Sequence, residues 1–123
     1  MQRTIVLGLA LVAAATPPLA AQGGPTDSAV LERRLRACLA AGAPTAPRDS
    51  LLAAIVALRS LCHTQIKRVE AVRLREVDAS FGLPAAQLGA TEQARLERER
   101  NLARRRLNHE IGMAVSNFTG LTE

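Results

Sequence analysis

The two cysteines of the chain, Cys38 and Cys62, are the residues whose types and positions point most directly to chemistry. Each falls on an apolar position of a helical pattern, so each is expected to face a packed neighbour. Two such cysteines pair in oxidising compartments, and closing their loop would stabilise the fold by about 3.5 kcal/mol in the chain-entropy model. Redox catalysis is disfavoured because no Cys-x-x-Cys spacing lowers a thiol pKa. The sequence therefore predicts a Cys38–Cys62 disulfide, with two buried free thiols as the alternative.

The histidines give no support for a metal or a catalytic site. Cys62-His63 lacks the first cysteine of a haem-attachment motif, because Arg59 stands at that position. His63 and His109 are the only histidines, and zinc requires more ligands at local spacing. The triplet Asn-His-Glu at 108–110 has the residue types for acid–base chemistry, but helical neighbours one position apart point away from each other. We expect no catalytic residue, no metal and no cofactor, and therefore no enzyme.

Three consecutive arginines, Arg104, Arg105 and Arg106, end the densest charge cluster of the chain, at 92–106. No acid follows them until Glu110, so they form a local basic patch. A solvated helix face is the simpler interpretation. The alternative is a contact for anionic lipid, another anionic envelope polymer or an acidic protein.

The composition limits the classes of partner. The net charge is +5, and Phe81 and Phe118 are the only aromatic residues. Modules that bind single-stranded nucleic acid, and many sugar sites, stack their ligands on aromatic faces. We therefore expect no nucleic-acid partner, and no small-molecule substrate is evident.

The first residues of the chain have the layout of a cleaved secretory signal. Arg3 gives a positive start, residues 5–15 are an apolar run, prolines at 17 and 18 end it, and small residues follow. Eleven apolar residues are too few for a spanning helix, which needs about 20. We expect residues 1–21 to be the signal, residues 22–27 a flexible leader, and residues 28–123 one helical domain that is periplasmic or secreted.

Three helical patterns follow the leader. The first begins at a capping residue among Thr26, Asp27 and Ser28 and ends where Gly42 can take a left-handed conformation and Pro44 cannot continue the helix. Residues 42–49 form a linker long enough to run back and set Cys38 opposite the middle of the next helix. The apolar positions of the first pattern are Leu31, Leu35, Cys38 and Leu39.

The second pattern is long and carries two adjoining apolar rows. It starts at a cap, Asp49 or Ser50, and continues to about residue 80, where Phe-Gly-Leu-Pro ends it. So wide a stripe is typical of a central helix with two neighbours. The third pattern, capped by Thr91 and reaching about residue 117, has a thinner stripe. This mismatch leaves apolar area for a partner groove or for a homodimer.

The stretch 88–96, Leu-Gly-Ala-Thr-Glu-Gln-Ala-Arg-Leu, resembles the Leu-Thr-x-x-Gln helix start of the Spy/CpxP-type periplasmic chaperones. That family is small, helical and basic, and the resemblance implies binding of unfolded clients. Here Gln93 follows Thr91 by two positions in place of three, and Ala90 replaces the leucine. No binding residue is transferred from this resemblance.

Taken together, these patterns predict an all-α, three-helix domain: an αα-hairpin stapled by a disulfide plus a long C-terminal helix. The expected function is a non-enzymatic structural, interaction or chaperone-like accessory role in the cell envelope, with an envelope protein as partner. The alternative is a basic protein that associates with an anionic membrane or polymer.

Overall fold

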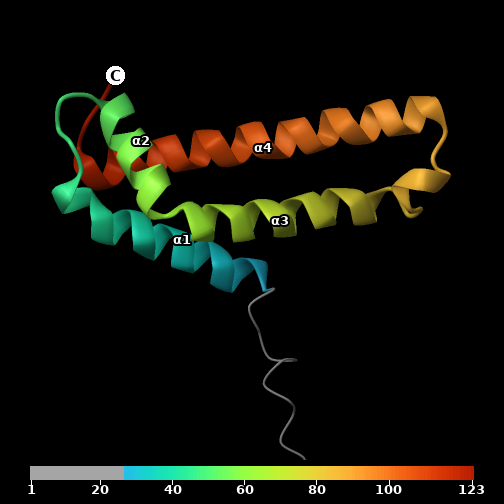
Figure 1. The fold of residues 1–123 in the computed structure, drawn as a ribbon, viewed down its shortest axis with the longest axis horizontal. Coiled ribbons are helices and arrows are strands. Elements are labelled where there is room, and N and C mark those ends of the chain that lie inside the picture. The colour runs from blue at the N-terminus through green and yellow to red at the C-terminus, as the bar shows by residue number, and fades with distance from the viewer. Residues whose placement is uncertain (1–26) are drawn as a thin grey trace, which may run out of the picture.

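The computed structural model describes residues 27–123 and has four helices longer than one turn in that range (Figure 1). The expected signal at 1–21 and nearly all of the expected leader lie outside the described residues. No helix within 27–123 is long and apolar enough to cross a membrane. The helices are α1 (Ser28–Gly42), α2 (Leu51–Leu61), α3 (His63–Ser80) and α4 (Ala90–Thr119), with short 3₁₀ turns η2 (Ala43–Thr45) and η3 (Ala85–Gln87).

The start of α1 follows the expected capping chemistry. Among the three candidate caps, Asp27 takes the role, and its Oδ1 accepts hydrogen bonds from the amides of Ala29 (2.9 Å) and Val30 (3.3 Å). Because the first-turn amides of a helix have no carbonyl partner, this carboxylate satisfies two of them. The helix then buries Leu31, Leu35 and Leu39 along one face.

Gly42 is the last residue of α1, but it is required for a different reason from the one expected. Its backbone is right-handed, with φ −80° and ψ −21°, so the predicted left-handed conformation is wrong. A β-carbon at this position would stand 2.6 Å from side-chain atoms of Leu58 and Leu61. Glycine is therefore needed because α1 and α2 approach each other closely here.

The all-α fold class is confirmed, but the long second helix divides into α2 and α3 at Cys62. Cys62 has φ −99° and ψ 18°, and serves both as the C-cap of α2 and as the N-cap of α3. No proline or glycine marks this break in the sequence. In Figure 1, α2 is steeply inclined to α3, and it crosses the end where α1 and α4 terminate. The bend thus lets α2 cover that end of the core, which a straight helix would leave open.

The other two helices form a long antiparallel pair. Gly82, at φ +70°, helps to turn the chain between α3 and α4, and the N-cap of α4 is Gly89, with no side-chain cap, so the expected cap at Thr91 is wrong. Figure 1 shows that α1 lies beside only the first part of α3, so the far part of the α3–α4 pair projects beyond it. The main core sits where all four helices meet; its largest fully buried side chains are Leu31, Leu39, Leu58, Cys62, Val69, Ile111 and Val115.

Candidate functional site

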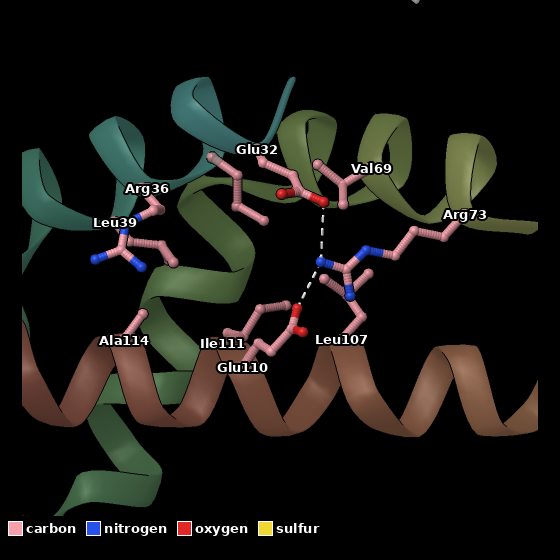
Figure 2. Close-up of a pocket in the computed structure, with 10 residues that line it drawn as sticks. Glu32, Arg36, Leu39, Val69, Arg73, Leu107, Glu110, Ile111 and Ala114 are labelled. Atoms are coloured by element: carbon pink, nitrogen blue, oxygen red, sulfur yellow. Dashed lines mark hydrogen bonds and ion pairs between the residues drawn. The ribbon is translucent and has the colours of Figure 1, made fainter. Parts of the chain in front are cut away.

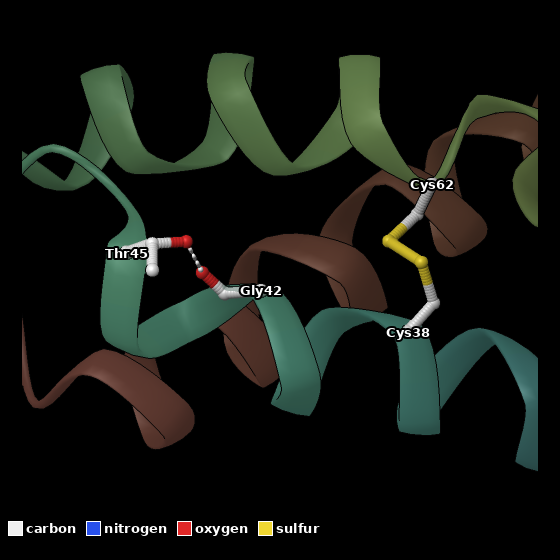
Figure 3. The surroundings of a disulfide bond; sticks show 4 residues. All are labelled: Cys38, Gly42, Thr45 and Cys62. Atoms are coloured by element: carbon white, nitrogen blue, oxygen red, sulfur yellow. Dashed lines mark hydrogen bonds between the residues drawn. A yellow bond between two sulfur atoms is a disulfide. The ribbon is translucent and has the colours of Figure 1, made fainter.

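The disulfide joins α1 to the bend between α2 and α3, as Figure 3 shows. The Cα atoms of Cys38 and Cys62 are 5.9 Å apart, and the predicted pairing is confirmed. Cys62 is 1% exposed, which places the bridge in the core. In Figure 1, the connector after α1 leads away from α1 to the start of α2. Helix α2 then returns toward α1, and its end brings Cys62 to Cys38. This path resembles the expected one, except that Cys62 stands at a helix joint and not in the middle of a helix.

The surroundings of the disulfide are structural in character. Thr45 donates its hydroxyl to the carbonyl oxygen of Gly42 at 3.1 Å, which closes the turn after α1 (Figure 3). The bridge and the close approach at Gly42 lie one helical turn apart on α1, so they hold the same helix at two successive turns. Within residues 27–123 there is no free cysteine.

The residues of the Asn-His-Glu triplet point in separate directions, as the helical geometry predicts. Asn108 accepts a hydrogen bond from Arg59 of α2 at 3.0 Å. Glu110 pairs with Arg73 of α3 at 2.6 Å, and His109 is exposed. His63 is also exposed, at the start of α3. Among the described residues, no three His, Cys, Asp or Glu side chains are grouped so that they could hold a metal ion.

A groove between α1 and α4 contains an ion-pair network centred on the partly buried Arg73 (Figure 2). Arg73 Nη2 lies 3.1 Å from Glu32 Oε1 of α1 and 2.6 Å from Glu110 Oε2 of α4, so one guanidinium joins three helices. Partial burial alone would lower the pKa of Arg73, but the hydrogen bonds and charges of Glu110 and Glu32 outweigh it and raise that pKa. Arg73 therefore stays charged and acts as a clamp.

The same groove has an apolar floor and a second, weaker contact between α1 and α4. Arg36 of α1 stacks over the ring of Phe118 of α4, with 5.7 Å between the guanidinium carbon and the ring centroid. Between the Arg73 ion pairs and the Arg36–Phe118 contact lies a hollow of about 320 Å³. This volume is near the lower limit for small-molecule pockets. Its acids and bases largely neutralise one another. The side chains of its floor are Leu35, Leu39, Val69, Leu107, Ile111 and Ala114.

The three consecutive arginines do not form one patch in space. Successive residues of a helix are rotated by about 100°, so these side chains leave α4 in three directions. Arg104 is half-buried and donates to Asn101 Oδ1 at 3.1 Å. Arg105 and Arg106 are exposed, and neither is paired with an acid of residues 27–123.

A different set of residues forms a continuous exposed row on α4, which we call the α4 stripe. Its spacings of 4, 3, 4 and 4 keep all members on one side of a helix, and every member is exposed. The stripe combines arginine, histidine and apolar side chains and contains no acid. The spacing of these basic and apolar residues is visible in the sequence, so their helical periodicity alone could have identified the stripe. Its members are Arg98, Leu102, Arg105, His109 and Met113.

The apolar surface of α2 adjoins one end of this stripe. Leu52 and Val56 of α2 are 70% and 60% exposed, and we call these two residues the α2 patch; Met113 of the α4 stripe is 53% exposed. Two hollows, of about 510 and 360 Å³, share Leu51 and Ile55 in their walls. The first also includes His109 and Met113, and the second includes Leu52. The patch and the stripe therefore form one continuous surface, the contact face.

Comparison with known proteins gives no match: no protein-family model, no curated protein and no solved structure is detectably similar to this chain. The resemblance of residues 88–96 to the Spy/CpxP-type chaperones thus remains a local one. Functional inference for this chain depends on its own side chains.

Proposed function

We propose that this protein is a small exported accessory protein of the cell envelope that acts by binding another envelope component, in a structural or chaperone-like role, and not by catalysis. The observation that carries the proposal is the α2 patch. Large aliphatic side chains exposed together on a small domain are typical of an interaction surface. The two hollows beside the patch provide depth for inserted apolar groups.

The positions of the ionisable groups favour binding over chemistry. The carboxylates of the α1–α4 groove, Glu32 and Glu110, are both held by Arg73, so neither is a free general base. A catalytic acid or base works best when its pKa lies near neutrality. The arrangement instead supports a rigid frame, stapled by the disulfide, that presents α2.

Crosslinking in the native compartment tests this proposal. A photoreactive amino acid at Val56 samples the α2 patch, and the same amino acid at Leu83 is the matched control. Leu83 is 54% exposed but lies in the turn between α3 and α4, at the opposite end of the molecule (Figure 1). We expect a discrete envelope product, whether protein or lipid, from Val56 and none from Leu83. Equal crosslinking from both positions, or none from Val56, would overturn the proposal.

A further inference from the structure

We propose that the contact face docks on an anionic lipid surface, with α4 lying along the headgroups and the α2 patch entering the boundary between headgroups and acyl chains. This inference rests on the proposed function and names the partner of the same surface. It also replaces the expected contact, Arg104 to Arg106, with residues that share one side of α4.

The charges of the α4 stripe have the sign that an anionic surface requires. Arg98 and Arg105 are exposed, and neither forms an ion pair with an acid of residues 27–123. Residues 98 and 113 are separated by about 22 Å along the helix axis at 1.5 Å per residue. His109 lies between them on the same side of α4 and is exposed. Arg106, although off the stripe, is also exposed and unpaired within this range.

The apolar members of the face are placed so that they enter lipid together with those charges. Leu102 is 38% exposed and stands between the two arginines. The hollows beside Met113 and Leu52 continue the surface on to α2, where Val56 is exposed one helical turn from Leu52. Interfacial segments combine arginine with exposed aliphatic side chains in this way, because headgroup phosphates attract the first and the acyl boundary accepts the second.

A second copy of the chain fits the face less well than lipid does. A two-fold dimer through the contact face would bring the arginine-bearing stripes of the two copies together, and the stripe has no acid to oppose them. Glu123 lines both hollows of the face. Its carboxylate opposes docking on phosphates there, but one carboxylate cannot balance the stripe.

The chain contains no tryptophan and no tyrosine, so one introduced indole reports insertion directly. The processed protein carrying Leu52→Trp is titrated with vesicles of phosphatidylcholine alone, and with vesicles that also contain phosphatidylglycerol. We expect a blue-shifted emission only with the anionic vesicles, and weaker binding as salt screens the charges. Leu83→Trp is the control and is expected to show no shift. An equal shift in both variants, or a shift with neutral vesicles, would contradict an oriented docking.

Charge-matched variants locate the contact. Arg98→Gln with Arg105→Gln should weaken vesicle binding about 25-fold, at about fivefold for each arginine near an anionic surface. Arg33→Gln with Arg34→Gln removes the same charge from the exposed side of α1 and should change binding less than twofold. Glu123→Gln should strengthen binding. Equal losses from the two arginine pairs would mean that only net charge matters, and would overturn the assignment to this face.

The vesicle results and the crosslinking results separate the two proposals. Absence of vesicle binding together with protein crosslinks from Val56 would overturn the lipid inference and leave the proposed function standing. Absence of both would overturn both. Circular dichroism and non-reducing mass analysis of each variant show whether the helices and the disulfide are intact before binding is measured.

Discussion

At the scale of single residues, close packing matters more than conformational freedom for whether a helical position requires glycine. Gly42 and Gly112 both occupy helices, but a β-carbon has different surroundings at the two positions. At Gly42 it would meet Leu58 and Leu61 side-chain atoms at 2.6 Å, whereas at Gly112 its nearest neighbour is Ile55 Cδ1 at 3.7 Å. Leu61 is exposed, but Leu58 is 2% exposed, so Leu58 has little room to move.

We therefore expect opposite effects from the same substitution at the two glycines. Gly112→Ala should stabilise the fold by about 0.5–1 kcal/mol, since alanine loses less backbone entropy in a helix. Gly42→Ala should destabilise it by about 1 kcal/mol, because overpacking near Leu58 outweighs that gain. Urea unfolding measures both. A stabilised Gly42→Ala variant would show that α1 and α2 can separate without cost.

The disulfide acts on stability at the same scale. Cys38→Ala with Cys62→Ala should lower the free energy of unfolding by about 2–5 kcal/mol, a large share for a domain of this size. Thermal unfolding of this variant, and of the wild type with and without reductant, measures the loss. A change below about 0.5 kcal/mol would show that the helix packing alone sets the fold, against the chain-entropy model.

At the scale of helices, the far part of the α3–α4 pair lies outside the main core and buries Leu88 and Leu96 separately from it. Arg100 forms two hydrogen bonds with Asp78, Nε to Oδ1 and Nη2 to Oδ2, both at 2.8 Å. Beyond them, Arg95 of α4 stacks over Phe81 at 4.9 Å. The hydrogen bond from Arg100 holds the pKa of Asp78 below its ordinary value, and the positive charge of Arg100 acts in the same direction against partial desolvation.

The sign of this pKa shift predicts how acid affects the projecting pair. Because the folded pKa of Asp78 is lowered, its contribution is fully present above the ordinary value of 3.8 and is lost as pH falls through the lowered one. We expect amide exchange in residues 76–100, corrected for intrinsic rates, to lose protection below that pH before the stapled core does. Asp78→Asn should abolish this acid-dependent loss of protection in residues 76–100. An unchanged pH dependence of exchange in that variant would exclude Asp78 as the cause of the loss.

The sequence predicted the helices better than the bend between them. The caps at Asp27 and Ser50, the stripe of α1 and the disulfide all depend on local residue types or on spacing, and these are visible in the chain. The bend at Cys62 was missed because no helix breaker marks it. It arises from packing of α2 across the ends of other helices, which no local pattern encodes.

The candidate site also combines features that local sequence encodes with features that only packing determines. Arg104, Arg105 and Arg106 were grouped because they are adjacent in sequence, yet a helix sends them in three directions. The α4 stripe is encoded by a helical period and was within reach of sequence reasoning. The mismatch between the apolar rows also predicted uncovered apolar area, but not its position at Leu52 and Val56, because which row of α2 is covered depends on where three other helices pack.

At the scale of the whole molecule, the contact face predicts that a protein comprising residues 22–123 is a monomer at low salt. Two copies meeting through this face would oppose Arg98 and Arg105 of one with those of the other, and exposed like charges repel more strongly when little salt screens them. Raising the salt concentration should weaken that repulsion and strengthen apolar association through Leu52 and Val56. Sedimentation velocity in low and high salt measures this: we expect one monomeric species at low salt and a larger species growing with salt. Leu52→Ser with Val56→Ser should remain monomeric in both. A dimer that forms at low salt and dissociates as salt rises would show that the copies are held by charge attraction, and would favour a second copy over lipid as the occupant of the face.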